Sequence, residues 1–389
     1  MAPFLGLNTI NFVPLLLLMI GLIHTYRHVV ILVEGRVDVL LKEEESELQR
    51  KLTILNKPHI QTIYAPWGDT YDCIEFHKQP AFDNPLLKNY TFKMGENHIV
   101  STRSSQLEKL LNQVDECPKG TVPIRRTTRE DLIRAKSLSS NGNPDKQYRA
   151  GISYRAQKTG ETLYGAKGWF NFWNPSVNQD QFSSTEIALY AGSGEETNVL
   201  KHGWRVDPQL YGGSNLTRTF AYWTGGSGKK EGCYNTLCSG FVQVHDKYTL
   251  DMPIYKSSTV GGLQYTQVTF ISLEFGKWWL TIHEDIQIGY WPSELFPAFA
   301  PGAGWIYWGG RVKAGKDGVS PPMGSGQQMD DHAYHNGYIE QVQYVDMTSN
   351  PQRPETIEYT IDCFEHYNAR YYQKNDIVHF GGTGGGNCQ

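Results

Sequence analysis

The sequence lacks the features that mark several large classes of protein. Neither part of the chain is strongly basic, since residues 1–140 carry 17 Lys and Arg against 16 Asp and Glu, and the remainder carries 19 against 24. A nucleic-acid-binding surface needs a strong positive field. Nucleic acid is therefore not expected as a partner.

The common catalytic and metal-binding signatures are also missing. The chain has no G-x-S-x-G, no G-x-x-x-x-G-K-[ST], no H-E-x-x-H and no C-x-x-C motif. One local cluster, DDHAYH at residues 330–335, has metal-ligand residue types, but a lone polar cluster of this kind is more often solvated surface. The residues HED at 283–285 interrupt a Trp-rich strand and are expected to form an exposed turn rather than a catalytic dyad. Neither a metal nor a cofactor is expected.

What the chain does contain is typical of an all-β protein. Its 389 residues are 39% hydrophobic and 13% aromatic, with 39 Gly, 10 Trp and 23 Tyr, which excludes disordered, collagenous and coiled-coil chains. After Tyr148, short runs rich in Tyr, Trp, Val, Thr and Ile alternate with Gly, Asn, Asp and Pro about every ten residues. Such spacing leaves no room for crossover helices, so we expect an antiparallel two-sheet β-sandwich.

The expected strands are the apolar runs between these turn signals. They are 149–156, 163–173, 186–191, 199–206, 218–224, 241–244, 265–274, 278–289, 304–312, 337–345 and 369–373.

The N-terminus indicates secretion. The apolar run 12–23 has signal-peptide length and is too short to span a bilayer, so residues 1–28 are interpreted as a signal peptide. No Lys or Arg precedes that run and a second apolar patch follows at 29–33, so an uncleaved anchor is the alternative. Sequons at Asn89 and Asn215 fit the secretory route to the extracellular space, cell wall or vacuole.

Two domains are predicted after this leader. Apolar positions three and four residues apart favour an amphipathic helix over 37–55, which opens a small α+β domain at 35–140. The stretch SLSSNGNPDKQY at 137–148 consists of turn formers and polar residues and is interpreted as an exposed linker. The sandwich domain then covers 148–389.

Six cysteines are consistent with disulfides in both domains. Cys73 and Cys117 lie in the first domain and can close it with one bridge. The other four, Cys233, Cys238, Cys363 and Cys388, lie in the second domain, and their number alone leaves the pairing open.

A series of long motifs makes the chain recognisable. In order, they are YDCIEFHKQPAFDNPLLKN, CPKGTVPIRRTTREDLIRAKSL, YGAKGWFNFWNP, GWRVDPQLYG, TRTFAYWT, GCYNTLCSGFVQ, IGYWPSELF, WGG, PPMGSG and HFGGTGGGNC. Together they resemble the neprosin family of plant secreted glutamic endopeptidases, across nearly the whole chain after the leader.

The resemblance implies both an architecture and a chemistry. It implies an N-terminal activation peptide, a catalytic β-sandwich and cleavage after proline in acidic conditions. It also implies the pairings Cys233 to Cys238 and Cys363 to Cys388. In the family, two glutamates face each other across a concave sheet, where one keeps a proton while the other activates water.

This chain departs from the family at both catalytic positions. One family glutamate lies two residues before the Gly-Trp of the GWxVxPxLYG motif and the other directly follows WGG. Those places hold Lys201 and Arg311. Arg stays protonated at any workable pH and cannot act as a base. Lys201 could act as one only if burial beside Arg311 lowered its pKa.

Two interpretations of the substituted pair remain open. Either the cleft has decayed and both side chains face solvent, or the pair lines an aromatic groove that binds a peptide or another anionic ligand. The groove would be built from seven aromatic residues, although the sandwich core is the default location of each ring. These are Trp204, Tyr222, Trp223, Trp279, Tyr290, Trp291 and Trp308.

Three functions therefore follow from the sequence. The first is a catalytically impaired, ligand-binding homologue, the second an active acid prolyl endopeptidase that uses other residues, and the third a structural secreted glycoprotein. A monomer is expected, with the chain's own N-terminal domain as a cover for the groove.

Overall fold

The computed structural model describes residues 42–88, 90, 115–140, 146–156, 160–226, 232–283, 285–386 and 388. The chain separates into two compact units, residues 1–51 and 52–389. In the first unit, residues 42–51 are helical and Arg50 Nε lies 2.8 Å from Glu47 Oε2. The helix continues to residue 55, which confirms the described part of the helix predicted over 37–55. The predicted signal peptide lies outside the described residues.

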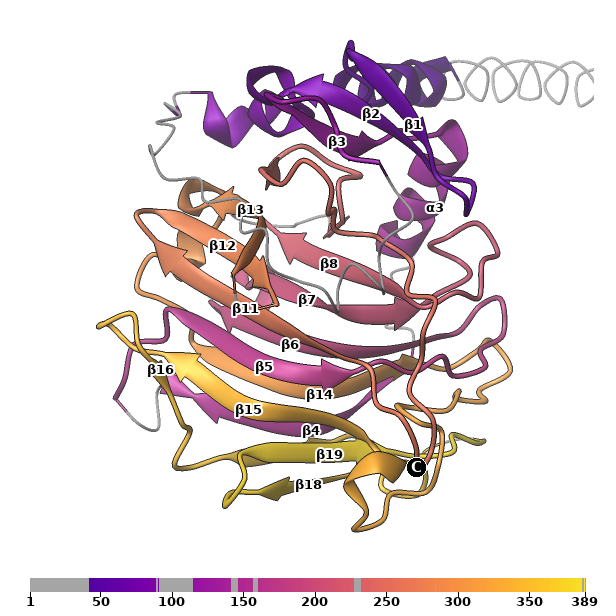
Figure 1. Ribbon diagram of the computed structural model, residues 1–389, viewed down its shortest axis with the longest axis vertical. Coiled ribbons are helices and arrows are strands. Elements are labelled where there is room, and N and C mark those ends of the chain that lie inside the picture. Colours follow the sequence, from indigo (N-terminus) through magenta and orange to yellow (C-terminus); the bar gives the residue numbers. More distant parts are fainter. Residues whose placement is uncertain are drawn as a thin grey trace, which may run out of the picture. The chain divides into compact units, whose positions relative to one another are not determined.

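The second unit begins with a three-stranded antiparallel sheet in the order β1-β2-β3 (Figure 1). The strands are β1 (Gln61–Tyr64), β2 (Thr70–Glu75) and β3 (Thr121–Arg125). Three short 3-10 helices follow β2: η1 (Phe76–Lys78), η2 (Pro80–Asp83) and η3 (Pro85–Leu87).

Helix α3 (Arg129–Ser140) follows β3. Its start is fixed by a reciprocal cap, in which the Thr128 backbone N–H donates to Asp131 Oδ2 at 2.9 Å and the Asp131 N–H donates to Thr128 Oγ1 at 3.1 Å. The predicted linker at 137–148 is wrong at both ends, because α3 continues to Ser140 and the next strand starts at Gln147. A polar helix end resembles a loop in sequence because both are rich in Ser.

The rest of the chain forms two antiparallel sheets, which confirms the predicted fold class. One sheet has the order β17-β4-β14-β6-β7-β8-β9, and is called the inner sheet here. Its strands are β4 (Gln147–Arg155), β6 (Phe182–Ala191), β7 (Asn198–Val206), β8 (Arg218–Thr224), β9 (Cys233–Tyr234), β14 (Trp305–Lys313) and β17 (Glu358–Ile361).

The other sheet, called the outer sheet, has the order β10-β13-β12-β11-β5-β15-β19-β18, with β16 added to β15. Its strands are β5 (Gly165–Asn171), β10 (Val242–Gln243), β11 (Thr266–Glu274), β12 (Lys277–Ile282), β13 (Ile286–Pro292), β15 (Gly337–Val345), β16 (Pro351–Gln352), β18 (Asn368–Tyr372) and β19 (Ile377–Gly381). Connecting turns include η4 (Gly194–Glu196), η5 (Ser293–Leu295), η6 (Pro297–Phe299) and η7 (Ala333–His335).

The strand predictions fail mainly where turns are short or strands are peripheral. The single strand expected over 278–289 is a hairpin, because β12 and β13 are joined by a turn that contains His283 and Asp285. That turn is the one expected for these two residues, while Glu284 lies outside the described residues. Strand β19 and the short strands β9, β16 and β17 were not predicted. The predicted domain bounds stay predictions.

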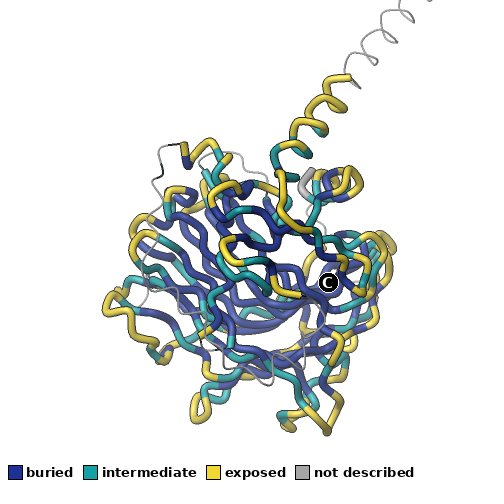
Figure 2. Tube along the Cα trace, turned by 45° about the horizontal axis from the view of Figure 1, so that its top comes forward, coloured by how far each residue is buried: buried dark blue, intermediate teal, exposed yellow. Residues whose placement is uncertain are grey.

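The main core lies between the two sheets (Figure 2). Successive side chains along a strand point to opposite faces. On β6, Ile187 and Leu189 enter the core, so Glu186 lies on the opposite face of the inner sheet. All ten residues of β6 are nevertheless buried, which shows that this second face is covered as well.

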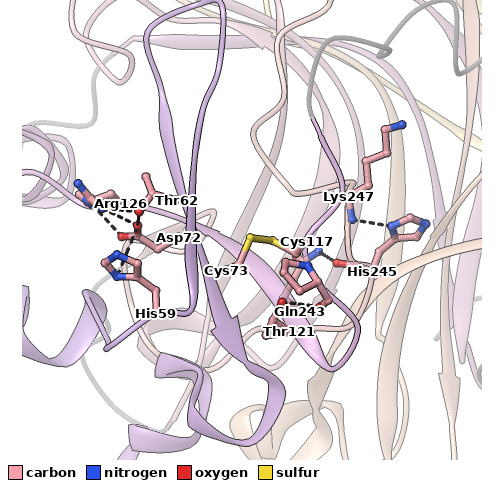
Figure 3. The surroundings of a disulfide bond; sticks show 11 residues. His59, Thr62, Asp72, Cys73, Cys117, Thr121, Arg126, Gln243, His245 and Lys247 are labelled. Atoms are coloured by element: carbon pink, nitrogen blue, oxygen red, sulfur yellow. Dashed lines mark hydrogen bonds and ion pairs between the residues drawn. A yellow bond between two sulfur atoms is a disulfide. The ribbon is translucent and has the colours of Figure 1, made fainter.

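All six cysteines are paired as expected, in the bonds Cys73–Cys117, Cys233–Cys238 and Cys363–Cys388. Such pairing is typical of proteins that fold in an oxidising compartment. Figure 3 shows the first bond close to Gln243 and His245 of the sandwich. There the Cys117 N–H donates to the Asp246 carbonyl at 2.9 Å, so the bridge stands at a contact between the N-terminal sheet and the sandwich.

A buried ion network joins the same two parts. Asp69, between β1 and β2, lies 3.0 Å from Arg125 Nε on β3 and 2.5 Å from Arg218 Nη1 on β8. Arg125 also lies 3.4 Å from Asp131 and 3.6 Å from Asp251 of the sandwich. Burial favours the neutral form of Asp69, but the charges of Arg125 and Arg218 hold its pKa below the usual range. The ionised carboxylate therefore stabilises the contact.

Replacing Asp69 by asparagine is expected to lower the free energy of unfolding by about 2 kcal/mol, because two buried guanidinium groups lose their shared anion. Urea denaturation and limited proteolysis of residues 52–140 measure the effect. The matched control is Glu75→Gln. Glu75 forms an exposed pair with Lys78 at 2.9 Å, so this substitution should change the free energy of unfolding by less than about 0.5 kcal/mol. Equal effects of the two substitutions would contradict a buried network.

Among the described residues, no helix combines the length and hydropathy that crossing a membrane requires.

Candidate functional site

Three charged side chains meet on the face of the inner sheet that points away from the core. Glu186 lies on β6, Lys201 on the adjacent β7 and Arg311 on β14, which pairs with β6 on its other side. On β7, Leu200 and Trp204 enter the core, so the side chain of Lys201 lies on the opposite face of the sheet, as that of Glu186 does. The strand order β14-β6-β7 thus brings Lys201 and Arg311, the two residues predicted to replace the family glutamates, to one carboxylate.

The strand register explains how the three side chains reach one another. Glu186 pairs with Gly203 on one side and with Gly309 on the other, so no side chain stands directly beside it. Lys201 and Arg311 occupy diagonal positions, opposite residues 188 and 184 respectively. Lys201 Nζ lies 3.3 Å from Glu186 Oε1, and Arg311 Nε donates to the same oxygen at 2.7 Å.

The cluster is almost completely removed from solvent. Exposed fractions of the side chains are 1% for Glu186, 12% for Lys201 and 13% for Arg311. Arg311 Nη2 also donates to the Tyr190 hydroxyl at 2.9 Å. The expectation that the two cations point freely at solvent is therefore wrong.

Burial and mutual charge set the protonation of the cluster. Burial alone would raise the pKa of Glu186, but the charges of Arg311 and Lys201 outweigh it and lower the pKa to about 2. Burial, followed by repulsion from Arg311, lowers the pKa of Lys201 to about 7 despite the nearby carboxylate. Burial disfavours the charge of Arg311, but attraction to Glu186 together with Tyr190 and Tyr307 raises its pKa, so it stays charged.

The cluster lines a cavity of about 160 Å³. A third cation, Arg205, also lines it and has a side chain that is 4% exposed. Its guanidinium carbon lies 3.6 Å from the centre of the Phe182 ring, and its Nε and Nη1 donate no hydrogen bond to any described residue. Leu138 of α3 contributes to the wall. The complete lining is Leu138, Gln147, Glu186, Lys201, Arg205, Phe220, Tyr222, Gly232, Tyr234 and Arg311.

The expected aromatic groove does not form around this cavity. Of the seven aromatic residues predicted for it, Tyr222 alone is among the described lining residues. The remaining six are in two apolar clusters. Trp204, Trp223, Trp291 and Trp308 lie in the main core, whereas Trp279 and Tyr290 pack with Ile74, Phe76, Val122 and Ile124 of the N-terminal domain. On the inner sheet, alternation turns Trp204, Trp223 and Trp308 away from the charged face. The other three rings lie on β12 and β13 of the outer sheet.

Other predicted positions lie apart from the cavity lining. In the 330–335 cluster, His335 Nδ1 lies 2.7 Å from Asp330 Oδ2, and Asp331 is paired with Arg370. Within the described ranges, the only grouping with metal-ligand geometry is Cys363, His366 and Cys388, whose two sulfur atoms already form a disulfide. Asn215 is exposed in a loop, and Asn89 lies outside the described residues.

Sequence reasoning missed the two residues that complete the site, Glu186 and Arg205. A lone carboxylate inside FSSTEIALYA, a strand otherwise built from apolar and small residues, was a usable signal. The spacing of Arg205, four residues after Lys201 on the same strand, was another, because an even spacing returns a side chain to the same face. Their partners become visible only once the strands are ordered into a sheet.

Two family models and a set of solved structures are similar to this chain. Residues 179–383 match the family model described as Neprosin, and residues 62–165 match the model described as Neprosin activation peptide. The chain is also similar to solved structures of scytalido-glutamic peptidase with a transition state analog inhibitor and of SCP-B, a member of the Eqolisin family of peptidases, in a complex with the tripeptide Ala-Ile-His. Each has 7% sequence identity and a TM-score of 0.34, covering 60% of this chain and 98% of the other.

The Neprosin model alone matches more than half of the 389 residues, and the activation-peptide model precedes it in the order that the sequence motifs implied. The chain therefore belongs to the neprosin family.

Proposed function

We propose that this chain is a secreted neprosin homologue that does not hydrolyse peptides and that binds a peptide or another anionic ligand in the cavity beside Lys201 and Arg311. The observation that carries the proposal is the pairing of Glu186 with both cations, at 2.7 Å to Arg311 Nε and 3.3 Å to Lys201 Nζ.

The absence of hydrolysis follows from the protonation states in the cavity. Glutamic peptidase chemistry needs one ionised carboxylate as a base and a second, protonated one as an acid. Glu186 is the sole carboxylate among the described residues that line the cavity. Its pKa of about 2 keeps it ionised and bound to two cations throughout the acidic range, so it neither shares a proton nor is free to activate water.

Anion binding is supported by the charge balance of the lining. Lys201, Arg205 and Arg311 contribute three basic groups against the one carboxylate of Glu186. A cavity with low-dielectric walls and an excess of one charge attracts the opposite charge. Guanidinium groups are also the preferred partners of carboxylates, because their donors match the two oxygens.

The test is a peptide assay on the full chain. A proline-containing peptide incubated between about pH 3 and 6 is expected to remain uncut. A short acidic peptide is expected to raise the melting temperature, whereas its amidated, uncharged counterpart should not, because only the former supplies an anion. Cleavage in this pH range would contradict the proposal and favour an active acid endopeptidase. If neither peptide shifts the melting temperature, the result contradicts ligand binding and favours the alternative that the protein is a structural secreted glycoprotein.

A second candidate function rests on Lys201. Its pKa of about 7 meets the condition under which a lysine can act as a general base. Hydrolysis by this route would rise as the pH passes upward through 7, the opposite of an acid peptidase, because only the neutral amine accepts a proton. Extending the same assay to about pH 9 separates the two.

A further inference from the structure

We propose that Lys201 is a reactive amine that forms a reversible imine with a small carbonyl compound carrying a carboxylate, of the 2-oxo acid class. The proposal rests on the anion site described above and adds a covalent step to it. It is carried by two side chains that line the same small cavity: the amine of Lys201 and the buried guanidinium of Arg205, which has two N–H groups that make no hydrogen bond with any described residue.

The amine of Lys201 is held in a defined position. Its Nζ lies 3.3 Å from Glu186 Oε1, 5.7 Å from the centre of the Tyr190 ring and 5.5 Å from that of Tyr222. These contacts come from the strands on both sides of β7, so the side chain spans a fixed gap in the sheet. A nucleophile gains most when it is oriented before its substrate arrives.

The surroundings also favour the nucleophilic, neutral form of this amine. Burial, followed by the neighbouring charge of Arg311, lowers the pKa of Lys201 to about 7. A lysine beside a second cation or out of contact with water is the usual arrangement in enzymes that form Schiff bases with carbonyl compounds. An exposed lysine has almost no neutral amine at the same pH.

Arg205 supplies the anchor for a carboxylate. It lines the same cavity as Lys201 and comes from the same face of the same strand. Arg205 is ion-paired with Asp207 at 3.6 Å and hydrogen-bonded to Tyr234, but its Nε and Nη1 make no hydrogen bond with any described residue. A buried guanidinium with unused donors is costly unless an anion completes it.

The size of the cavity limits the part of a ligand that enters it to a few heavy atoms, such as one side chain or one end of a peptide. A protein cavity of about 150 Å³ holds benzene, and this one has a volume of about 160 Å³. Pyruvate has no more heavy atoms than benzene and carries a ketone next to its carboxylate. Its ketone can therefore react with Lys201 while its carboxylate binds Arg205.

The proposed step is balanced without an oxidant or a reductant. The lone pair of Lys201 Nζ attacks the carbonyl carbon, and the π electrons of the C=O bond move to oxygen. A water molecule carries one nitrogen proton to that oxygen, which gives a carbinolamine, while Glu186 Oε1, at 3.3 Å from Nζ, holds the amine in place. The C–O bond then breaks, the oxygen leaves as water with a second proton, and the C=N bond forms. Addition of water reverses the step.

Reductive trapping on the full chain tests the proposal. Protein is incubated at neutral pH with pyruvate and cyanoborohydride, and the modified lysines are identified by peptide mapping. Lys201 is expected to be modified at least about tenfold more than Lys374, an exposed lysine on the same chain, because it holds far more neutral amine. Lactate, which has the carboxylate but no carbonyl, should compete and protect Lys201.

Two variants and one binding measurement complete the design. Lys201→Arg keeps the positive charge beside Glu186 and should abolish the modification at this site, and Arg205→Lys should weaken it by removing the paired donors. Modification of Lys201 no greater than that of Lys374 in the unmodified chain overturns the inference, whatever the variants do. If lactate still raises the melting temperature in that case, the anion site stands and only the imine fails. If lactate has no effect either, both proposals fail.

Discussion

Replacing Glu186 by glutamine is expected to lower the free energy of unfolding by about 3 to 5 kcal/mol at neutral pH. The substitution keeps the shape of the side chain but leaves Arg311 and Lys201 buried without their shared counter-ion. Removing one partner of a buried ion pair costs far more than the pair contributes, because an uncompensated charge remains in a medium of low polarity. Urea denaturation at pH 7 measures the difference.

The effect should also depend on pH in a defined direction. The pKa of Glu186 is lowered from 4.5 to about 2 in the folded chain, so this group stabilises the fold fully above pH 4.5. That contribution is lost as the pH falls from 4.5 towards 2, and the difference between the wild type and Glu186→Gln should shrink over the same interval. The control is Glu195→Gln on the exposed η4. Its free energy of unfolding is expected to lie within about 0.5 kcal/mol of the wild-type value. A Glu186→Gln variant as stable as this control would contradict the buried ion cluster.

Giving this chain acid peptidase activity is expected to require three substitutions rather than two. The variant Lys201→Glu, Arg311→Glu places a glutamate at each position where the family resemblance expects one, but both then lie against Glu186, and Arg205 is the one cation left among the described residues that line the cavity. Three neighbouring carboxylates repel one another, and some must take up protons at high cost. Adding Glu186→Gln leaves two carboxylates on diagonal positions around a neutral amide.

The triple variant should cleave a proline-containing peptide in the acidic range at a rate at least about 100-fold above the wild type, since general acid–base groups contribute this much or more. Cleavage is measured by mass spectrometry on the full chain, with circular dichroism to confirm folding. The matched control replaces all three residues by glutamine, which keeps similar volumes but no carboxylate. A folded triple variant without activity would show that the chain has lost more than its two glutamates.

The class of fold could be inferred from the sequence because it depends on local patterns. Alternating strands with closely spaced turn residues admit an antiparallel sandwich and little else, and the structure has this fold. Errors arose where a pattern is ambiguous over a few residues. The hairpin of β12 and β13 resembled one strand because both its arms are rich in Trp and Ile, and the Ser-rich end of α3 resembled a loop.

The site was only half predictable. Lys201 and Arg311 were found because their flanking motifs, GWRVDPQLYG and WGG, fix their positions in the chain. Six of the seven aromatic residues were misplaced, since a ring suits a sandwich core as well as a groove and the sequence does not state which face of a strand points inward.

By itself, the sequence determined that this chain is a disulfide-bonded β-sandwich with two cations, Lys201 and Arg311, at the positions where the family resemblance expects two glutamates. Only the tertiary structure decided what those cations do. Glu186 is separated by 15 residues from Lys201 and by 125 from Arg311, and it contacts both because β7 and β14 flank β6 in one register. Charge interactions depend on distance and burial, which sheet order sets and composition does not. For that reason the two cations found from the motifs form, in the folded chain, a buried ion cluster with Glu186.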